Sequence, residues 1–142
     1  MFAESIKDLM DKIQELEDFK AGAVQRGDQG KATTVSSPGC IVMPDFDSPT
    51  EFSGDPGELS KKIAFIASCF LLIKGYTKLE DAENAALALA EKVLSKVQNA
   101  EFQVNMNGNM KYYHWELKRM DFLQRTSSLA VLNIEFQYYL QT

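Results

Sequence analysis

The feature that most constrains the fold is the stretch from Ile63 to Ile73, apolar except for Ser68, inside a predicted strand that covers residues 61–74. Both alternating sets of side chains in this run are apolar, so neither face suits water, and such a strand belongs at the centre of a sheet. The run is too short to cross a bilayer, which takes about 20 residues. We therefore expect a central strand covered on both faces, and part of that cover can come from another subunit.

Two amphipathic helices are predicted, one on each side of this strand in the chain. The apolar stripe of the first consists of Phe2, Ile6, Leu9, Ile13 and Leu16, and Gly22 is its expected stop. The second is predicted for residues 78–98, with Thr77 and Glu80 forming a capping box at its start. Its stripe consists of Ala82, Ala85, Ala86, Leu89, Val93 and Val97. The small alanines predict close approach of this helix to a sheet.

Four further strands are predicted, for residues 40–46, 101–106, 111–123 and 129–140. Pro44 favours an edge position or a strand end for the first of them. Asn107-Gly108 predicts a tight turn after the second. In the last strand, Ala130, Leu132, Ile134, Phe136 and Tyr138 should face inward, whereas Asn133, Glu135 and Gln137 should face water. The predicted fold class is α+β, with a mixed or antiparallel sheet of about four to five strands packed against two helices.

The polar segments predict one domain, residues 1–142, with long loops at about 22–39 and 45–60. A short strand is expected near residues 33–35. The second loop is acidic, with Asp45, Asp47, Glu51 and Asp55. Its spacing does not match the twelve-residue calcium loop, so a solvated loop or a docking site for a basic partner is expected instead.

Charge and rare residues exclude several classes of function. The formal net charge of −5 argues against gripping a phosphate backbone. Cys40 and Cys69 lie in apolar runs and are expected to be buried thiols, with a disulfide possible only if their strands are neighbours. A single histidine and no C-x-x-C spacing predict no metal and no cofactor. No signal peptide is expected, so the chain should be made and remain soluble in a cytoplasm.

Aromatic residues gather on the two strands that end the chain, which suggests contacts with a protein partner. Tyr113, Trp115 and Tyr139 are candidates for a subunit interface, because Tyr and Trp are enriched at interface hot spots. They are also common in plain sheet cores. His114 could act as a general base, but a sheet-surface or interface role suits it better, because no catalytic motif accompanies it. We expect no catalytic residue and no enzyme activity.

The order helix, loop, strand, acidic loop, long strand, helix, short strand, long strand and strand resembles the tail terminator (tail completion) proteins of long-tailed bacteriophages. The segments that carry the resemblance are residues 40–44, residues 63–73 running into the helix at 79–97, and above all residues 130–138. The resemblance extends from about residue 3 to residue 140. It is one of layout, without a sequence motif.

This resemblance implies a structural virion protein without catalytic residues. The protein would form a ring, in the family a hexamer, that caps the tail tube, ends its polymerisation and joins the tail to the head or neck. Its partners would be copies of itself, the tail tube protein and head–tail connector proteins. DNA would only pass through the lumen, no membrane would be involved, and assembly would take place in the host cytoplasm. The alternatives are another neck or head–tail connector component, a small cytoplasmic protein-binding adaptor, or an enzyme of unfamiliar type.

Overall fold

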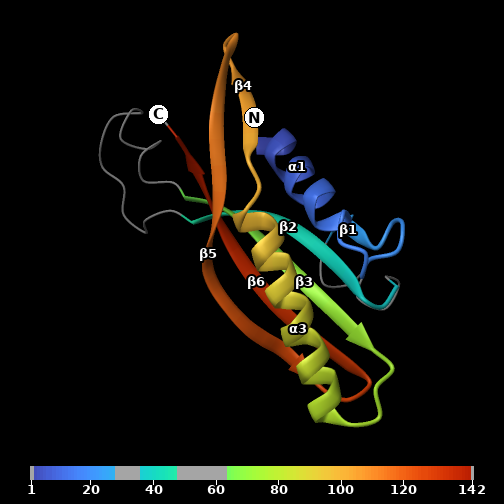
Figure 1. Ribbon diagram of the computed structural model, residues 1–142. Helices are drawn as coiled ribbons and strands as arrows, with labels where there is room; N and C mark the ends of the chain where they lie inside the picture. Colours follow the sequence, from blue (N-terminus) through green and yellow to red (C-terminus); the bar gives the residue numbers. More distant parts are fainter. Residues whose placement is uncertain (1, 28–35, 48–63, 142) are drawn as a thin grey trace.

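The computed structural model describes residues 2–27, 36–47 and 64–141, the side chain of Asp47 excepted. In chain order its elements are α1 (Phe2–Gln14), β1 (Val24–Arg26), β2 (Gly39–Asp47), β3 (Ala64–Lys74), α3 (Leu79–Gln98), β4 (Phe102–Met106), β5 (Asn109–Arg125) and β6 (Leu129–Leu140). These strands form one sheet of six, in the order β1-β2-β3-β6-β5-β4. Both helices lie on the same face of this curled sheet (Figure 1), which we call the inner face. The α+β class is confirmed, although the sheet has more strands than the four to five predicted.

The additional strand is β1, which sequence patterns did not reveal because it is only three residues long. It pairs parallel to the start of β2, with Val24 opposite Cys40, and this pairing makes the sheet mixed. β1 ends opposite Val42, so Pro44 lies on a stretch of β2 that β1 does not reach, which agrees with the expected edge position. The short strand expected near residues 33–35 lies outside the described residues.

The N-terminal helix has the predicted stripe but ends earlier than Gly22. Ile6, Leu9 and Ile13 are buried against the sheet. Gln14 then binds the chain that follows: its amide donates to the Lys20 carbonyl at 2.8 Å, and its oxygen accepts from the Val24 N–H at 3.0 Å. These bonds hold the chain in the turn that leads into β1, so α1 stops at Gln14.

β3 is the central strand that the apolar run predicts. It pairs antiparallel with β2 on one side and with β6 on the other. Phe65, Ala67, Cys69, Leu71 and Ile73 belong to the inner cluster, under the helices. Phe70 and Leu72 join Ile41 and Val131 in a second buried cluster on the opposite, outer face. Both faces of this strand are therefore buried, as expected.

The second helix, α3, lies across the inner face on its predicted stripe. Ala82, Ala86, Leu89, Val93 and Val97 are buried, so the alanines do permit close packing. The predicted capping box is wrong. The residue before the helix is Lys78, and no side chain caps the helix start.

β4, β5 and β6 form an antiparallel meander at the C-terminal end of the chain. The predicted tight turn joins β4 to β5, with Asn107 and Gly108 both at positive φ. Figure 1 shows this hairpin extending beyond the rest of the sheet. β5 carries irregularities between Leu117 and Arg119 and between Phe122 and Gln124, which add local twist. β6 spans the residues predicted for it.

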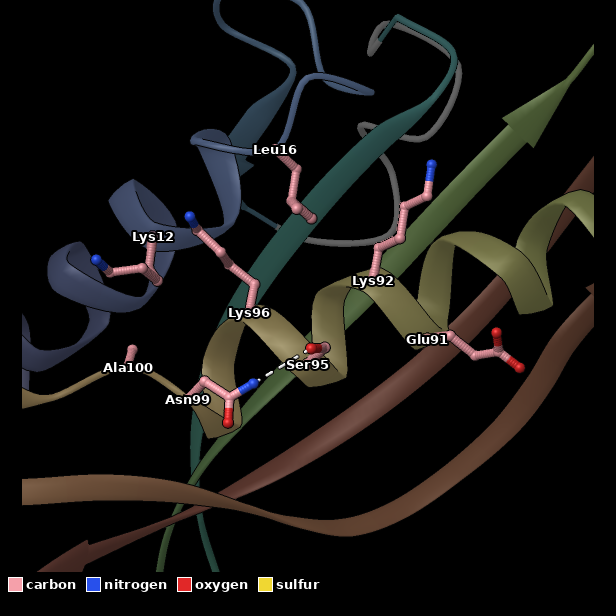
Figure 2. A pocket seen from close by; sticks show the side chains of 8 residues that line it. All are labelled: Lys12, Leu16, Glu91, Lys92, Ser95, Lys96, Asn99 and Ala100. Atoms are coloured by element: carbon pink, nitrogen blue, oxygen red, sulfur yellow. Dashed lines mark hydrogen bonds between the residues drawn. The ribbon is translucent and has the colours of Figure 1, made fainter.

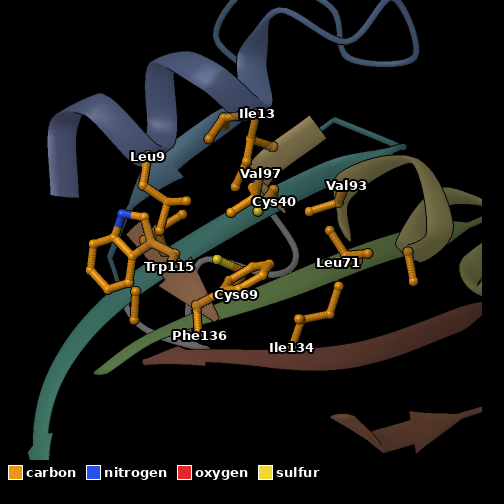
Figure 3. Packing of buried hydrophobic residues seen from close by; sticks show 14 of the residues in the cluster. Leu9, Ile13, Cys40, Cys69, Leu71, Val93, Val97, Trp115, Ile134 and Phe136 are labelled. Atoms are coloured by element: carbon orange, nitrogen blue, oxygen red, sulfur yellow. The ribbon is translucent and has the colours of Figure 1, made fainter. Parts of the chain in front are cut away.

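The core lies between the helices and the inner face of the sheet. Figure 3 shows Leu9, Ile13, Val93 and Val97 of the helices facing Cys40, Cys69, Leu71, Trp115, Ile134 and Phe136 of the sheet. Cys40 and Cys69 lie on the neighbouring strands β2 and β3, and both are free, buried thiols. A hydrogen bond between them and burial raise the pKa of the Cys69 thiol, which keeps it protonated and unreactive.

Asn133 corrects one prediction about β6. It was expected to face water, but only 4% of it is exposed. It points to the outer face and lies between Phe70 of β3 and Asp121 of β5, its neighbours in the sheet. An interior position in the sheet, which the alternation of β6 does not reveal, accounts for this burial.

Candidate interaction surface

Tyr113 and Trp115 lie in the protein's own core, not at its surface. Their exposed fractions are 2% and 1%. Both belong to the inner face of β5, opposite Leu140 and Tyr138 on β6. Burial under α1 leaves no part of either ring for a neighbour, which corrects the expectation that these two residues form a subunit interface.

Tyr113 instead ties α1 to the sheet. Its hydroxyl donates a hydrogen bond to the Asp8 carboxylate at 2.8 Å. Burial is the main cause that raises the pKa of Tyr113 above its ordinary value, and the bond to Asp8 raises it further. Burial also raises the pKa of Tyr138, whose ring lies 4.9 Å from that of Tyr113. These phenols therefore serve packing and anchoring at neutral pH, not proton transfer.

Tyr139 and His114 lie on the outer face, where the chain is open to partners. They face each other across β5 and β6 with stacked rings, 5.5 Å between centroids and 15° between planes. The His114 Nε2 atom lies 2.9 Å from Glu116 Oε1, and the Gln141 amide is 3.5 Å from His114 Nδ1. This imidazole is held in a surface network of ring and amide groups, the sheet-surface position that we expected for it.

Met110 and Tyr112 extend this surface along the projecting hairpin. They share the outer face with His114, because every second residue of a strand points the same way. Met110 is 57% exposed, Tyr112 50% and Tyr139 40%. We call Met110, Tyr112, His114 and Tyr139 the outer-face patch. Sequence reasoning did not select Met110 or Tyr112, because the alternation along β5 separates two faces without showing which of them becomes core.

A second exposed aromatic group lies at the start of α1. Phe2 is 40% exposed and Phe46, on β2, is 51% exposed. Their ring centroids are 5.5 Å apart with an 84° interplanar angle, and both rings contact the buried ring of Phe65. We call these two residues the Phe2–Phe46 pair. It lies on the inner face, because Phe46 pairs with Phe65.

The acidic docking loop predicted for residues 45–60 begins later than expected, because residues 45–47 belong to β2, and the described residues include nothing of it beyond Asp47. Asp45 is exposed on β2, and its carboxylate accepts the Phe46 N–H at 2.7 Å. Asp47 ends β2, and Glu51 and Asp55 lie outside the described residues. Asp45 and Phe46 are consecutive in β2, so the Asp45 side chain points to the outer face, away from the Phe2–Phe46 pair.

A groove of about 540 Å³ lies between α1 and α3 (Figure 2). Lys12 and Lys96, from the two helices, lie 3.1 and 3.8 Å from the Glu15 carboxylate, and Lys92 lies 3.0 Å from Asp18. The hydrogen bond from Lys12 lowers the pKa of the exposed Glu15 carboxyl. The Glu15 and Asp18 carboxylates offset the charge of these lysines. Both residues follow α1 in the chain, so their ion pairs with Lys96 and Lys92 link α3 to the segment after α1.

The residues described include no group of three or more His, Cys, Asp or Glu side chains that could hold a metal ion. Neither described helix combines the length and apolar character needed to cross a membrane. No protein-family model matches the chain, and no curated protein matches its sequence.

Proposed function

We propose that this chain is a structural virion protein of a long-tailed bacteriophage that caps the tail tube, ends its polymerisation and joins the tail to the head or neck. It acts as a ring of its own copies. The order of its elements, which resembles that of tail terminator proteins, supports this proposal. Its partners are the tail tube protein and the head–tail connector proteins, and it carries out no catalysis.

The observation that carries the proposal is the outer-face patch. Met110, Tyr112 and Tyr139 are each at least 40% exposed. The fourth member of the patch is His114. Aromatic and Met side chains are enriched at the centres of protein interfaces. Aromatic rings bury much area for few rotatable bonds, and Met adapts its shape to the surface that it meets. The patch lies on two paired strands and does not line the groove described above, which suits another protein surface better than a small substrate.

The net charge of the chain fits the passage of DNA through such a ring. A formal charge of −5 per copy gives the assembly a negative field, which repels the DNA backbone and so prevents sticking. The proposal therefore predicts that Asp and Glu dominate the central channel. A strongly basic channel in a structure of the ring would contradict this part of the proposal.

Native mass spectrometry and negative-stain electron microscopy test the proposal. Purified protein, alone and mixed with tubes of the tail tube protein of the same phage, is expected to form closed rings of one copy number, and the rings should sit at one end of each tube. Protein that stays monomeric or dimeric in both samples, at about 100 µM, would overturn the proposal. Binding along the whole tube would also contradict a cap.

A matched pair of variants links the ring to the outer-face patch. Tyr139→Ser is expected to abolish rings, whereas Leu87→Ser should leave them intact. Leu87 is exposed to the same extent, 40%, but lies on α3. Rings of Tyr139→Ser at wild-type abundance would show that this patch does not join the copies.

A further inference from the structure

We propose that two copies of this chain pair through the edge of β5, with Arg119 of each copy opposite Asp121 of the other and Met120 at the twofold axis. The two sheets then continue into one another through antiparallel strands. Identical surfaces that meet about a twofold axis give a pair and no ring. This contact is therefore separate from the outer-face patch, and it goes beyond the function proposed above.

The edge that forms the contact is the half of β5 that follows the hairpin. β4 pairs only with residues 109–113, so from His114 to Arg125 the strand is bonded to β6 on one side, and no described strand pairs with its other side. Residues 116–120 are all exposed, as expected where water reaches both faces of a strand at the sheet edge. An edge strand directs alternate backbone N–H and C=O groups away from its sheet, where another strand can bind them. The occupant that fits this edge is therefore a strand.

A short regular stretch of β5 carries charges of both signs on one face. The strand has irregularities on both sides of residues 119–122, and these four residues stay in regular register with β6. Arg119 and Asp121 lie on the outer face, with Arg119 Nε 3.8 Å from Asp121 Oδ1, whereas Met120 pairs with buried Ile134 on the inner face. The Arg119 side chain is 63% exposed and that of Asp121 42%, so both are accessible to a second copy.

The positions of these charges select one register for the pairing. Opposite residues of antiparallel strands point to the same face, so an outer-face residue must meet an outer-face residue. A twofold axis at Arg119 would place two guanidinium groups opposite each other, and an axis at Asp121 would oppose two carboxylates. An axis at Phe122 would place Asp121 opposite the irregular stretch. Only an axis at Met120 places each Arg119 opposite an Asp121, and opposite charges stabilise a strand pair whereas like charges destabilise it.

The same charges explain why the occupant is a second copy. Charged side chains at a sheet edge ordinarily discourage pairing with other strands. A copy in this register is attracted instead, because it brings an acid to each base and a base to each acid. Arg119 also lies 3.4 Å from Glu135, and its five N–H donors can serve both carboxylates. Two Arg–Asp pairs and the backbone bonds offset the repulsion between copies that each carry a net charge of −5.

Charge reversal in a Tyr139→Ser background, which lacks the ring contact proposed above, tests the pairing. This protein is expected to form dimers in sedimentation velocity. Arg119→Asp or Asp121→Arg should each raise the dimer dissociation constant about tenfold or more, because two attractive pairs become repulsive. An equimolar mixture of the two reversed proteins should form mixed dimers, since every opposed pair is then Arg with Asp. Lys111→Asp, an exposed reversal on the hairpin, is the control and should leave the dimer unchanged.

A cysteine cross-link in the otherwise wild-type protein measures the register. With oxidised glutathione, Met120→Cys is expected to give a disulfide-linked dimer, because directly opposite residues of two strands are close enough for a disulfide. Gln124→Cys, also at an exposed position, should not, since about 26 Å would separate its two copies along the paired strands. Cys40 and Cys69 are buried and do not compete.

A Tyr139→Ser protein that stays monomeric, mixtures without mixed dimers, or equal cross-linking at positions 120 and 124 would overturn this inference and leave the ring untouched. A wild-type protein that never forms rings, but pairs as described, would overturn the proposed function and leave this contact standing.

Discussion

The hydrogen bond from Tyr113 to Asp8 helps to fasten α1 to the sheet. Tyr113→Phe is expected to lower the free energy of unfolding by about 1–2 kcal/mol at pH 7. The raised pKa of Tyr113 means that the folded state holds the phenol proton more tightly than the unfolded state does. The stability that the Tyr113 hydroxyl contributes is therefore complete below about pH 10 and is lost as the pH rises further. Above about pH 10 the free energy of unfolding of the wild type should approach that of Tyr113→Phe.

Urea unfolding from pH 7 to pH 11.5 measures this difference. Tyr76→Phe is the control, because Tyr76 is exposed and its substitution should change stability by less than about 0.5 kcal/mol. Equal stability of Tyr113→Phe and the wild type at pH 7 would show that the bond to Asp8 does not hold α1.

At the scale of elements, the β4–β5 hairpin depends on the backbone freedom of Gly108. Its φ is +84°, and a Cβ atom there would meet nothing within 4 Å, so any cost of adding one is conformational. Gly108→Ala should destabilise the protein by about 1–2 kcal/mol, because L residues other than Gly resist this region. Asn107→Gly, at the neighbouring positive-φ position, should change stability little. Chemical denaturation compares the two, and an equally small effect of both would contradict a strained turn.

The elements differ in how well sequence periodicity predicts them. α3 and β6 are long and periodic, so both were predicted nearly to the residue. β1 was missed because three residues show no period, and its pairing depends on β2, which is distant in sequence. The capping box predicted for Thr77 and Glu80 does not form, because the helix begins one residue later, with Lys78 at the capping position. The sequence motif alone does not fix the residue at which the helix begins.

For the whole molecule, the burial of both faces of β3 makes a direct prediction. Leu72 is fully buried in the outer cluster, on the face opposite the helices. Leu72→Ala should therefore cost about 2–5 kcal/mol, as for other buried leucines. Leu87→Ala on the exposed side of α3 should cost less than about 0.5 kcal/mol. Thermal unfolding distinguishes the two variants. A loss of stability for Leu72→Ala as small as that for Leu87→Ala would show that packing in the outer cluster does not stabilise the fold.

Sequence by itself determined the α+β class, the central position of β3 and the two helical stripes, because alternation and helical periodicity act over neighbouring residues. Only the tertiary structure decided which side of β5 became core. The alternation of Tyr112, Tyr113, His114 and Trp115 separates two faces, but it does not say which one α1 covers. For that reason the sequence leaves Tyr113 and Trp115 as candidates for either an interface or a core, whereas the structure buries both and exposes Met110 and Tyr112. Packing between elements distant in the chain makes that choice, and local pattern does not contain it.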